Sequence, residues 1–268
     1  MAIITITRGS YSRGKEIAEK VAEKLGYECI GRETLIAASE QFNIPEIKLI
    51  RAIHDAPSIL DRFGYGKEKY IAYIKAALLR HVKEDNVIYH GLAGHFLLEG
   101  ISHVLKVRIN SDMEDRIVLE MERENISRGE AQRILESDDE QRRKWSRHLY
   151  GIDTTNPSLY DLVLHIKTLN ADDAVDVICY TVGLAHFQTT AESQKALEDR
   201  LLAAEVKAVL VDIKPDVDVL ATDGVVLVHT KAHISQEEHL VHRIREIGKS
   251  VPGVKEISIN VYPRQDVD

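Results

Sequence analysis

The sequence predicts an α/β protein in which a parallel sheet is flanked by helices, followed by a small α+β domain. Three observations lead to this prediction. Extended and helical segments alternate from Ile3 to about Val182, as in βαβ units. Several extended segments are almost continuously apolar, which is typical of strands covered on both faces. After residue 193 two alternating runs meet at Asp223-Gly224, a strong hairpin signal.

Composition narrows the class of protein. The 268 residues are 44% hydrophobic, enough for a substantial core, and 35 Lys and Arg against 43 Asp and Glu give a formal charge of -8. Binding to nucleic acid is therefore not expected. Cys29 and Cys179 are too few for a disulfide framework. With no leader pattern and no membrane-length apolar run, we expect a cytoplasmic protein without a membrane span.

The first domain is predicted over residues 1–186. It begins with a strand at 3–7 and a helix from Lys15, whose apolar face would cover the sheet. A strand at 27–30 and a long helical region at 33–83 follow. Three further strands are predicted in sequence order, at 86–90, 102–109 and 160–166, with charged helices between them.

The second domain is predicted over residues 194–268, after a polar linker at 187–193. Its expected elements are a helix at 194–207, strands at 216–221 and 225–232, a helix at 236–250 and a strand at 255–261. A helix laid across three strands of this length makes a compact module.

A glycine loop lies between the first strand and the first helix. Its seven residues satisfy GxxxxGK, the Walker A spacing, and they are Gly9, Ser10, Tyr11, Ser12, Arg13, Gly14 and Lys15. Such a loop directs backbone N–H groups and a helix N-terminus toward phosphates. A βα turn without ligand is the alternative. Glu16 stands where Ser or Thr usually contacts Mg²⁺. Three alternatives are open for this carboxylate: it binds the metal, it points away, or it repels the phosphates.

The first domain resembles the cytidylate kinase-like branch of the P-loop nucleoside monophosphate kinases. The resemblance is carried by ITRGSYSRGKEIAEKVAEKLGYECIGRETL, NVIYHGLAGHFLL, HVLKVRINSDMEDRIVLEMERENIS, DDEQRRKW and YDLVLHIKTLNADDAVDVI, within residues 3–182. It implies a P-loop NTPase-type sheet with a helical lid, ATP as phosphoryl donor and Mg²⁺ as its partner. It also implies that Lys15 and the loop hold the donor phosphates.

The resemblance places the lid in residues 123–147. Asp139 and Arg142 match the Asp-x-x-Arg element of the family, so the implied catalytic residues are Lys15, Asp139, Arg142 and, second among the arginines, Arg123. Other lid cations are Arg128, Arg133, Arg143 and Lys144. The alternative is an ordinary solvated face, because acidic residues are interspersed at helical spacing.

The sequence departs from the family pattern in three places, at residue 16, at residue 92 and at residues 165 and 167. Besides Glu16, Leu92 stands where such kinases carry an arginine for the acceptor phosphate, and His90 or His95 would compensate in part when protonated. The alternative for these histidines is a structural role. His165 and Lys167 replace residues that usually help to complete the fold.

The tail resembles a BON domain. The segment DVDVLATDGVVLVHTKAHISQEEHLVHRIREIGKSVPGVKEISINV carries the resemblance, with Thr230 in place of a usual glycine. It implies a ligand or protein partner for this domain, although core packing also explains the apolar alternation.

The predicted function is ATP-dependent phosphoryl transfer to a nucleoside monophosphate of the CMP type or to a related small acceptor. The alternatives are a non-catalytic nucleotide sensor coupled to the BON-like domain and a structural or lipid-associated protein in which the loop is a relic. No metal site is predicted, since His239 and His242 form an isolated pair. The oligomeric state is open.

Overall fold

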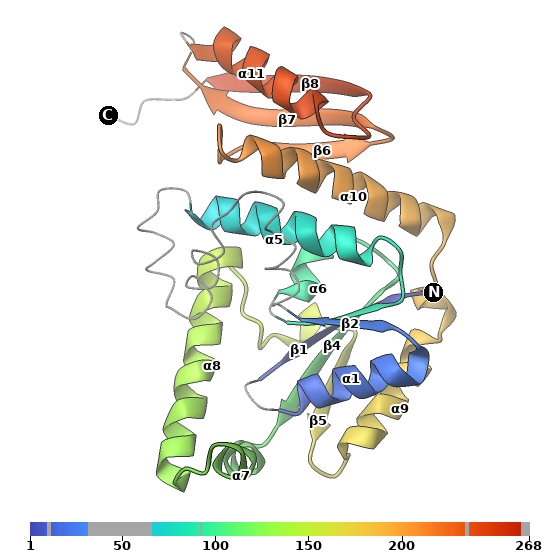
Figure 1. Cartoon of the computed structure of the whole chain (residues 1–268), viewed down its shortest axis with the longest axis vertical. Helices are drawn as coiled ribbons and strands as arrows, with labels where there is room; N and C mark the ends of the chain where they lie inside the picture. The colour runs from blue at the N-terminus through green and yellow to red at the C-terminus, as the bar shows by residue number, and fades with distance from the viewer. Residues whose placement is uncertain (10–11, 32–65, 92, 234–235, 264–268) are drawn as a thin grey trace. The chain divides into compact units, whose positions relative to one another are not determined.

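The computed structural model describes residues 1–9, 12–31, 66–91, 93–233 and 236–263 (Figure 1). Ser10, Tyr11, Leu92 and residues 33–65 of the predicted helical region lie outside the described residues. The described residues form two compact units, one of residues 1–31 and 84–193 and the other of residues 66–83 and 194–263. The division into independent domains at 187–193 stays a prediction.

The first unit contains the predicted parallel sheet. Its five strands are all parallel and lie in the order β2-β3-β1-β4-β5. Their bounds are β1 Ile3–Arg8, β2 Glu28–Gly31, β3 Val87–His90, β4 Val104–Ser111 and β5 Leu162–Ile166. This confirms the prediction from the alternating segments, and it places β1 in the middle of the sheet.

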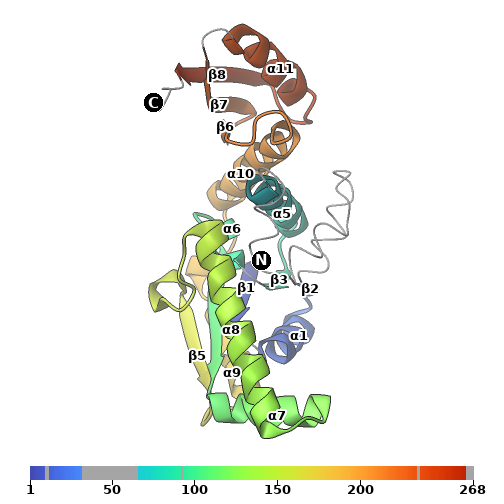
Figure 2. The same cartoon turned by 90° about the vertical axis from the view of Figure 1, so that its left-hand side faces the viewer.

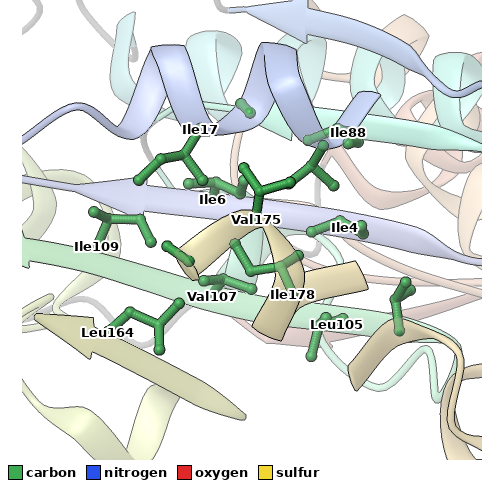
Figure 3. Packing of buried hydrophobic residues seen from close by; sticks show 14 of the residues in the cluster. Ile4, Ile6, Ile17, Ile88, Leu105, Val107, Ile109, Leu164, Val175 and Ile178 are labelled. Carbon is green, nitrogen blue, oxygen red and sulfur yellow. The ribbon is translucent and has the colours of Figure 1, made fainter. Parts of the chain in front are cut away.

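Two helices cover one face of this sheet. They are α1 (Gly14–Leu25) and α9 (Ala171–Val182), and both pack on alternate residues of β1 and β4. Figure 3 shows Ile17 of α1 and Val175 and Ile178 of α9 converging on these strands. The apolar spacing of α1 fixes which of its faces is buried, because residues three and four apart share one side of a helix.

Three further helices lie in the first unit, one after β3 and two after β4. They are α6 (Gly94–Leu97), α7 (Met113–Glu124) and α8 (Arg128–Tyr150), with short 3₁₀ turns at Pro157–Leu159 and Ala185–Phe187. Figure 2 shows α8 along its whole length, with α7 against its first turns. The segment predicted as the lid, residues 123–147, thus runs from the last two residues of α7 through most of α8.

The second unit contains a three-stranded sheet and three helices. Their bounds are α5 Gly66–Val82, α10 Ala191–Leu210, β6 Asp218–Thr222, β7 Val225–Ala232, α11 Glu237–Lys249 and β8 Glu256–Pro263. β6 and β7 are the predicted hairpin, and β8 pairs with β7 in parallel. Gly224 at the turn has φ 84°, and a Cβ there would lie 2.9 Å from the Gly253 carbonyl oxygen, so glycine is required.

Helix α10 begins earlier than the sequence predicts. The start was expected at Gln194, whereas the structure begins the helix at Ala191. The side chains of Thr190 and Ser193 accept hydrogen bonds from each other's backbone N–H, at 3.0 and 3.2 Å. This reciprocal cap satisfies donors at the helix start, so the end of the polar linker is helical.

No helix in the described part of the chain is long and apolar enough to cross a membrane. Cys29 and Cys179 are free thiols, and partial burial raises the pKa of each.

Replacing Ile178 by alanine is expected to lower the free energy of unfolding by about 2–5 kcal/mol, because its fully buried side chain leaves a cavity between α9 and the sheet. Chemical denaturation measures the loss. Tyr180→Ala on the same helix is the control, since that side chain is 74% exposed and its removal should change stability by less than about 0.5 kcal/mol. Equal losses in the two variants would contradict the assigned packing of α9.

Candidate functional site

A cavity of about 230 Å³ lies in the first unit where β1 and β4 end. Its lining comes from the end of β1 and the loop after it, from β4, from α7 and α8, and from the segment after α8. The lining residues are Thr7, Arg8, Gly9, Ser12, Arg108, Asn110, Ser111, Arg116, Asp139, Arg142, Arg143, Thr154 and Thr155. The carboxyl edge of a parallel sheet is where α/β proteins bind ligands.

Ser12 of the glycine loop contacts the main chain near the end of β4. Ser12 is buried, and its hydroxyl lies 3.1 Å from the Gly9 carbonyl oxygen and 3.2 Å from that of Ile109. Gly14 has no room for a side chain, because a Cβ would lie 2.7 Å from Cδ of Arg8. Arg13, the residue before α1, has the left-handed φ of 59°. These contacts position the described residues of the loop, Gly9 and residues 12–14, at the N-terminus of α1.

Lys15 and Glu16 face other charged residues of α1. The Lys15 ammonium lies 3.7 Å from Glu19, and its side chain is 61% exposed and is not part of the cavity lining. The Glu16 carboxylate lies 3.2 Å from Lys20 and 3.9 Å from Arg13. Glu16 thus has two cationic neighbours, which offset the repulsion that it would exert on a phosphate.

Helix α8 brings two of the predicted lid cations to the cavity. Arg142 and Arg143 of α8 line it. Asp139 pairs at 2.7 Å with Arg116 of α7, whose side chain is almost fully buried. Arg123 instead pairs with Glu120 at 2.9 Å and with Glu124 at 3.0 Å, and it is not part of the lining.

Of the predicted site residues, the structure thus brings Gly9, Ser12, Asp139 and Arg142 together. It does not bring Arg13, Gly14, Lys15, Glu16 and Arg123 into the cavity lining.

Sequence reasoning missed three arginines of the lining, Arg8, Arg108 and Arg116. Arg8 is the last residue of β1 and Arg108 lies in the second half of β4, toward the edge of a parallel sheet where binding residues are expected. That position was the available signal. Arg116 lies among other charged residues of α7, so its burial is not apparent from local spacing.

His95 lies buried beside the cavity. Its Nδ1 is 3.2 Å from the Thr7 hydroxyl oxygen, and its ring centroid is 4.9 Å from that of Tyr160. Burial, helped by the charges of Arg108 and Lys106, lowers the pKa of His95 to about 4. The ring is therefore neutral at pH 7, which favours the structural alternative over compensation for a missing cation.

His165 and Lys167 converge on Asp112, the residue before α7. His165 Nε2 lies 3.0 Å from the carboxylate, and the Lys167 ammonium binds its other oxygen. These contacts lower the pKa of Asp112, with the Lys167 hydrogen bond as the largest cause. The two residues that depart from the family pattern thus join the end of β5 to the start of α7.

The described residues contain no group of three or more His, Cys, Asp or Glu side chains arranged to hold a metal ion.

Comparison with known proteins identifies relatives of the N-terminal part of this chain. The sequence profile of the Cytidylate kinase-like family matches residues 3–168. A cytidylate kinase of Archaeoglobus fulgidus is 29% identical over 185 residues, which cover 67% of this chain and 93% of that protein. A cytidylate kinase of Methanopyrus kandleri is 30% identical over 104 residues, or 36% of this chain and 54% of that protein. The second match thus spans about half of its relative.

A solved structure has a similar fold. The crystal structure of an uncharacterized protein from Eubacterium ventriosum ATCC 27560 has a TM-score of 0.55 and 17% sequence identity, and the match covers 68% of this chain and 97% of that one. At this identity the likeness concerns the fold alone.

Protonation of His95 is expected to destabilise the protein as the pH falls from about 6.5 to about 4. The unfolded histidine binds a proton near 6.5 whereas the folded one does so near 4, so the unfolded state holds more protons in this window. Burial beside Thr7 and Tyr160, with Arg108 and Lys106 as the nearby charges, is the cause. The expected slope is at most about 1.4 kcal/mol per pH unit.

Urea unfolding at several pH values measures this slope. His95→Asn should reduce it, and His103, whose pKa burial also lowers, should account for part of the remainder. His239→Asn on the surface of α11 is the control and should keep the wild-type slope. An unchanged slope in His95→Asn would refute the assignment.

Proposed function

Because the chain belongs to the cytidylate kinase-like family, we propose that it transfers a phosphoryl group from ATP to a nucleoside monophosphate of the CMP type, or to a related small acceptor. The arginines of the cavity are the observation that carries this proposal. Arg8, Arg108, Arg116, Arg142 and Arg143 line it, and Asp139 is the carboxylate among the lining residues. A chain of net charge -8 thus concentrates cations around a space of about 230 Å³.

Phosphoryl transfer requires such a concentration of positive charge. The charge of the transferring group spreads over three oxygens, so catalysis consists mainly of positioning and electrostatic stabilisation. Guanidinium groups suit this task because their N–H donors match phosphate oxygens two at a time. We propose Arg142 as the first catalytic arginine of the lid and Asp139 as the carboxylate that holds Arg116. Arg123 stays a weaker proposal, because it is paired with Glu120 and Glu124.

The loop of residues 9–14 suits the donor phosphates of ATP. The close approach of Gly14 to Arg8 leaves backbone rather than side chain at the start of α1, where helix N–H groups attract anions. Lys15 would reach these phosphates after leaving Glu19, an exposed partner of little stabilising energy. Mg²⁺, when bound with ATP, supplies further neutralisation of phosphate charge. The pairing of Glu16 with Arg13 and Lys20 disfavours it as a metal ligand.

A non-catalytic nucleotide sensor is the second candidate function. The position of Lys15 outside the cavity lining favours it, because a lysine that stays beside Glu19 would not act on the donor. In this candidate the C-terminal unit would report nucleotide binding.

We propose that the C-terminal unit is BON-like and takes a ligand or protein partner. Its elements from α10 to β8 follow the order helix, strand, strand, helix, strand, and α10 and α11 contribute Val206, Leu210 and Ile244 to one core with the strands. A cytoplasmic location of the chain is also part of the proposal, in keeping with the two free thiols.

Lys15→Ala is expected to lower transfer of the γ-phosphate from Mg·ATP to CMP by about 100-fold or more, as when a single transition-state donor is removed. A panel of nucleoside monophosphates with radiolabelled ATP measures the transfer and identifies the acceptor. Lys24→Ala is the control, because Lys24 lies on the same helix and pairs with Asp176 away from the loop. If the wild type transfers no more phosphate than Lys15→Ala, the kinase proposal fails and the sensor takes its place.

Arg142→Ala is expected to lower kcat by about 100-fold, and Arg123→Ala by much less, because only Arg142 lines the cavity. Steady-state kinetics at saturating ATP and acceptor compare the two. Thermal unfolding of both variants verifies that the lid helices remain folded. A larger loss in Arg123→Ala would reverse the proposed order of the two arginines.

A further inference from the structure

Arg108 lines the cavity from within β4. The other lining arginines come from the last residue of β1 and from α7 and α8. Its neighbours Val107 and Ile109 belong to the core shared with α1 and α9 (Figure 3). Since successive side chains of a strand point to opposite faces, Arg108 lies on the other face of the sheet. It is paired in register with Thr7 of β1, two residues before the first loop glycine.

Arg108 rests on a platform of two buried rings. Its guanidinium carbon lies 5.7 Å from the centroid of the Tyr160 ring, and the Tyr160 ring lies against the ring of His95. Each ring is fixed by a hydrogen bond: the Tyr160 hydroxyl donates to the Thr154 carbonyl oxygen at 2.9 Å, and His95 contacts Thr7. The platform therefore contacts the Arg108 guanidinium through the Tyr160 ring.

The platform supplies no negative charge. Within the described residues no carboxylate lies within ion-pair distance of Arg108, whereas Arg116 has Asp139, Arg128 has Glu114 and Arg147 has Asp153. A guanidinium stacked on an aromatic ring keeps N–H donors at its edge, and those donors match a phosphate in two-point geometry. A partly buried cation without a counter-charge is thus available for an anion that enters the cavity.

We propose that Arg108 binds the phosphate of the phosphoryl acceptor, and that Tyr160 and His95 position its guanidinium. This inference rests on the proposed kinase function. The loop of residues 9–14 and the N-terminus of α1 take the donor phosphates, and Arg108 precedes that loop along the strands. The same cavity offers the hydroxyl of Thr154 as a further donor, whereas the Thr155 hydroxyl donates to Asp153.

Arg108→Ala is expected to raise the KM of CMP, or of the acceptor that the panel identifies, by about 10- to 100-fold, the range for a lost charged hydrogen bond. The KM of ATP should stay within about twofold of the wild type. Arg108→Lys keeps the charge but loses two-point contact, so its acceptor KM should fall between those of wild type and alanine variant. Tyr160→Leu removes the ring beneath Arg108 and should also raise the acceptor KM.

Lys106→Ala is the matched control. Lys106 lies two residues earlier on the same face of β4, pairs with Asp161, and does not line the cavity. Its acceptor KM should equal that of the wild type. A rise in the KM of ATP equal to that of the acceptor in Arg108→Ala would overturn the proposal, and so would a fall in kcat with both KM values unchanged.

Equilibrium binding separates this inference from the kinase proposal. Calorimetric titration with CMP in the absence of ATP should show binding to the wild type and to Lys106→Ala, with at least a tenfold weaker affinity in Arg108→Ala. This result supports the inference even if no transfer is detected, in which case the kinase proposal alone fails. Equal affinities in wild type and Arg108→Ala, or no CMP binding by the wild type, overturn it. Thermal unfolding of each variant verifies that the fold is retained.

Discussion

The central position of β1 is the constraint on which the site depends. β1 is hydrogen-bonded to β3 on one edge and to β4 on the other, and the side chains of Ile3 to Ile6 are buried. A strand held in this way has a fixed direction and register, since a shift by one residue would exchange its two faces. Gly9 follows this strand directly, and the Ser12 hydroxyl is within hydrogen-bond distance of the carbonyl oxygens of Gly9 and of Ile109 in β4. The site residues are thus placed by the sheet.

Positive charge is concentrated at the cavity of this acidic chain, and the structure shows which contacts stabilise it there. Five arginines line one cavity of an acidic protein. Arg116 is almost fully buried and is paired with Asp139, which offsets the free energy of removing it from water. Glu120, also buried, pairs with Arg123 on the same helix. Arg116 is thus paired with a carboxylate, whereas Arg108 contacts the aromatic platform and no carboxylate of the described residues lies within ion-pair distance of it.

The sheet was predictable because its signal is local. Apolar runs such as those at 86–90 and 160–166 are long enough to indicate buried strands, and their alternation with helices dictates parallel pairing. The hairpin at Asp223-Gly224 was predictable for the same reason, since its turn requires positive φ at both positions. The start of α10 was misjudged because Thr190 and Ser193 look like loop residues until their reciprocal hydrogen bonds are seen.

The cavity lining was only partly predictable because it joins residues that are distant in sequence. A motif locates Gly9 and Ser12, and a family resemblance locates Asp139 and Arg142. Nothing in the local pattern says that Arg116 is buried or that Arg108 meets Tyr160 across the sheet. Functional sites are expected to depart from local sequence patterns in this way. A charged residue in an apolar strand lowers the stability of the sheet, but it can bind a ligand.

The neutral state of His95 follows from the same cluster of charge. Arg108 and Lys106 add to burial in lowering its pKa, so the cations of β4 and the histidine of the platform repel one another when His95 is protonated. An anion bound by Arg108 would weaken this repulsion and raise the pKa of His95. By linkage, proton binding and anion binding at this site then favour each other. At neutral pH the ring stays uncharged, and Thr7 and Tyr160 keep the contacts that hold Arg108 toward the cavity.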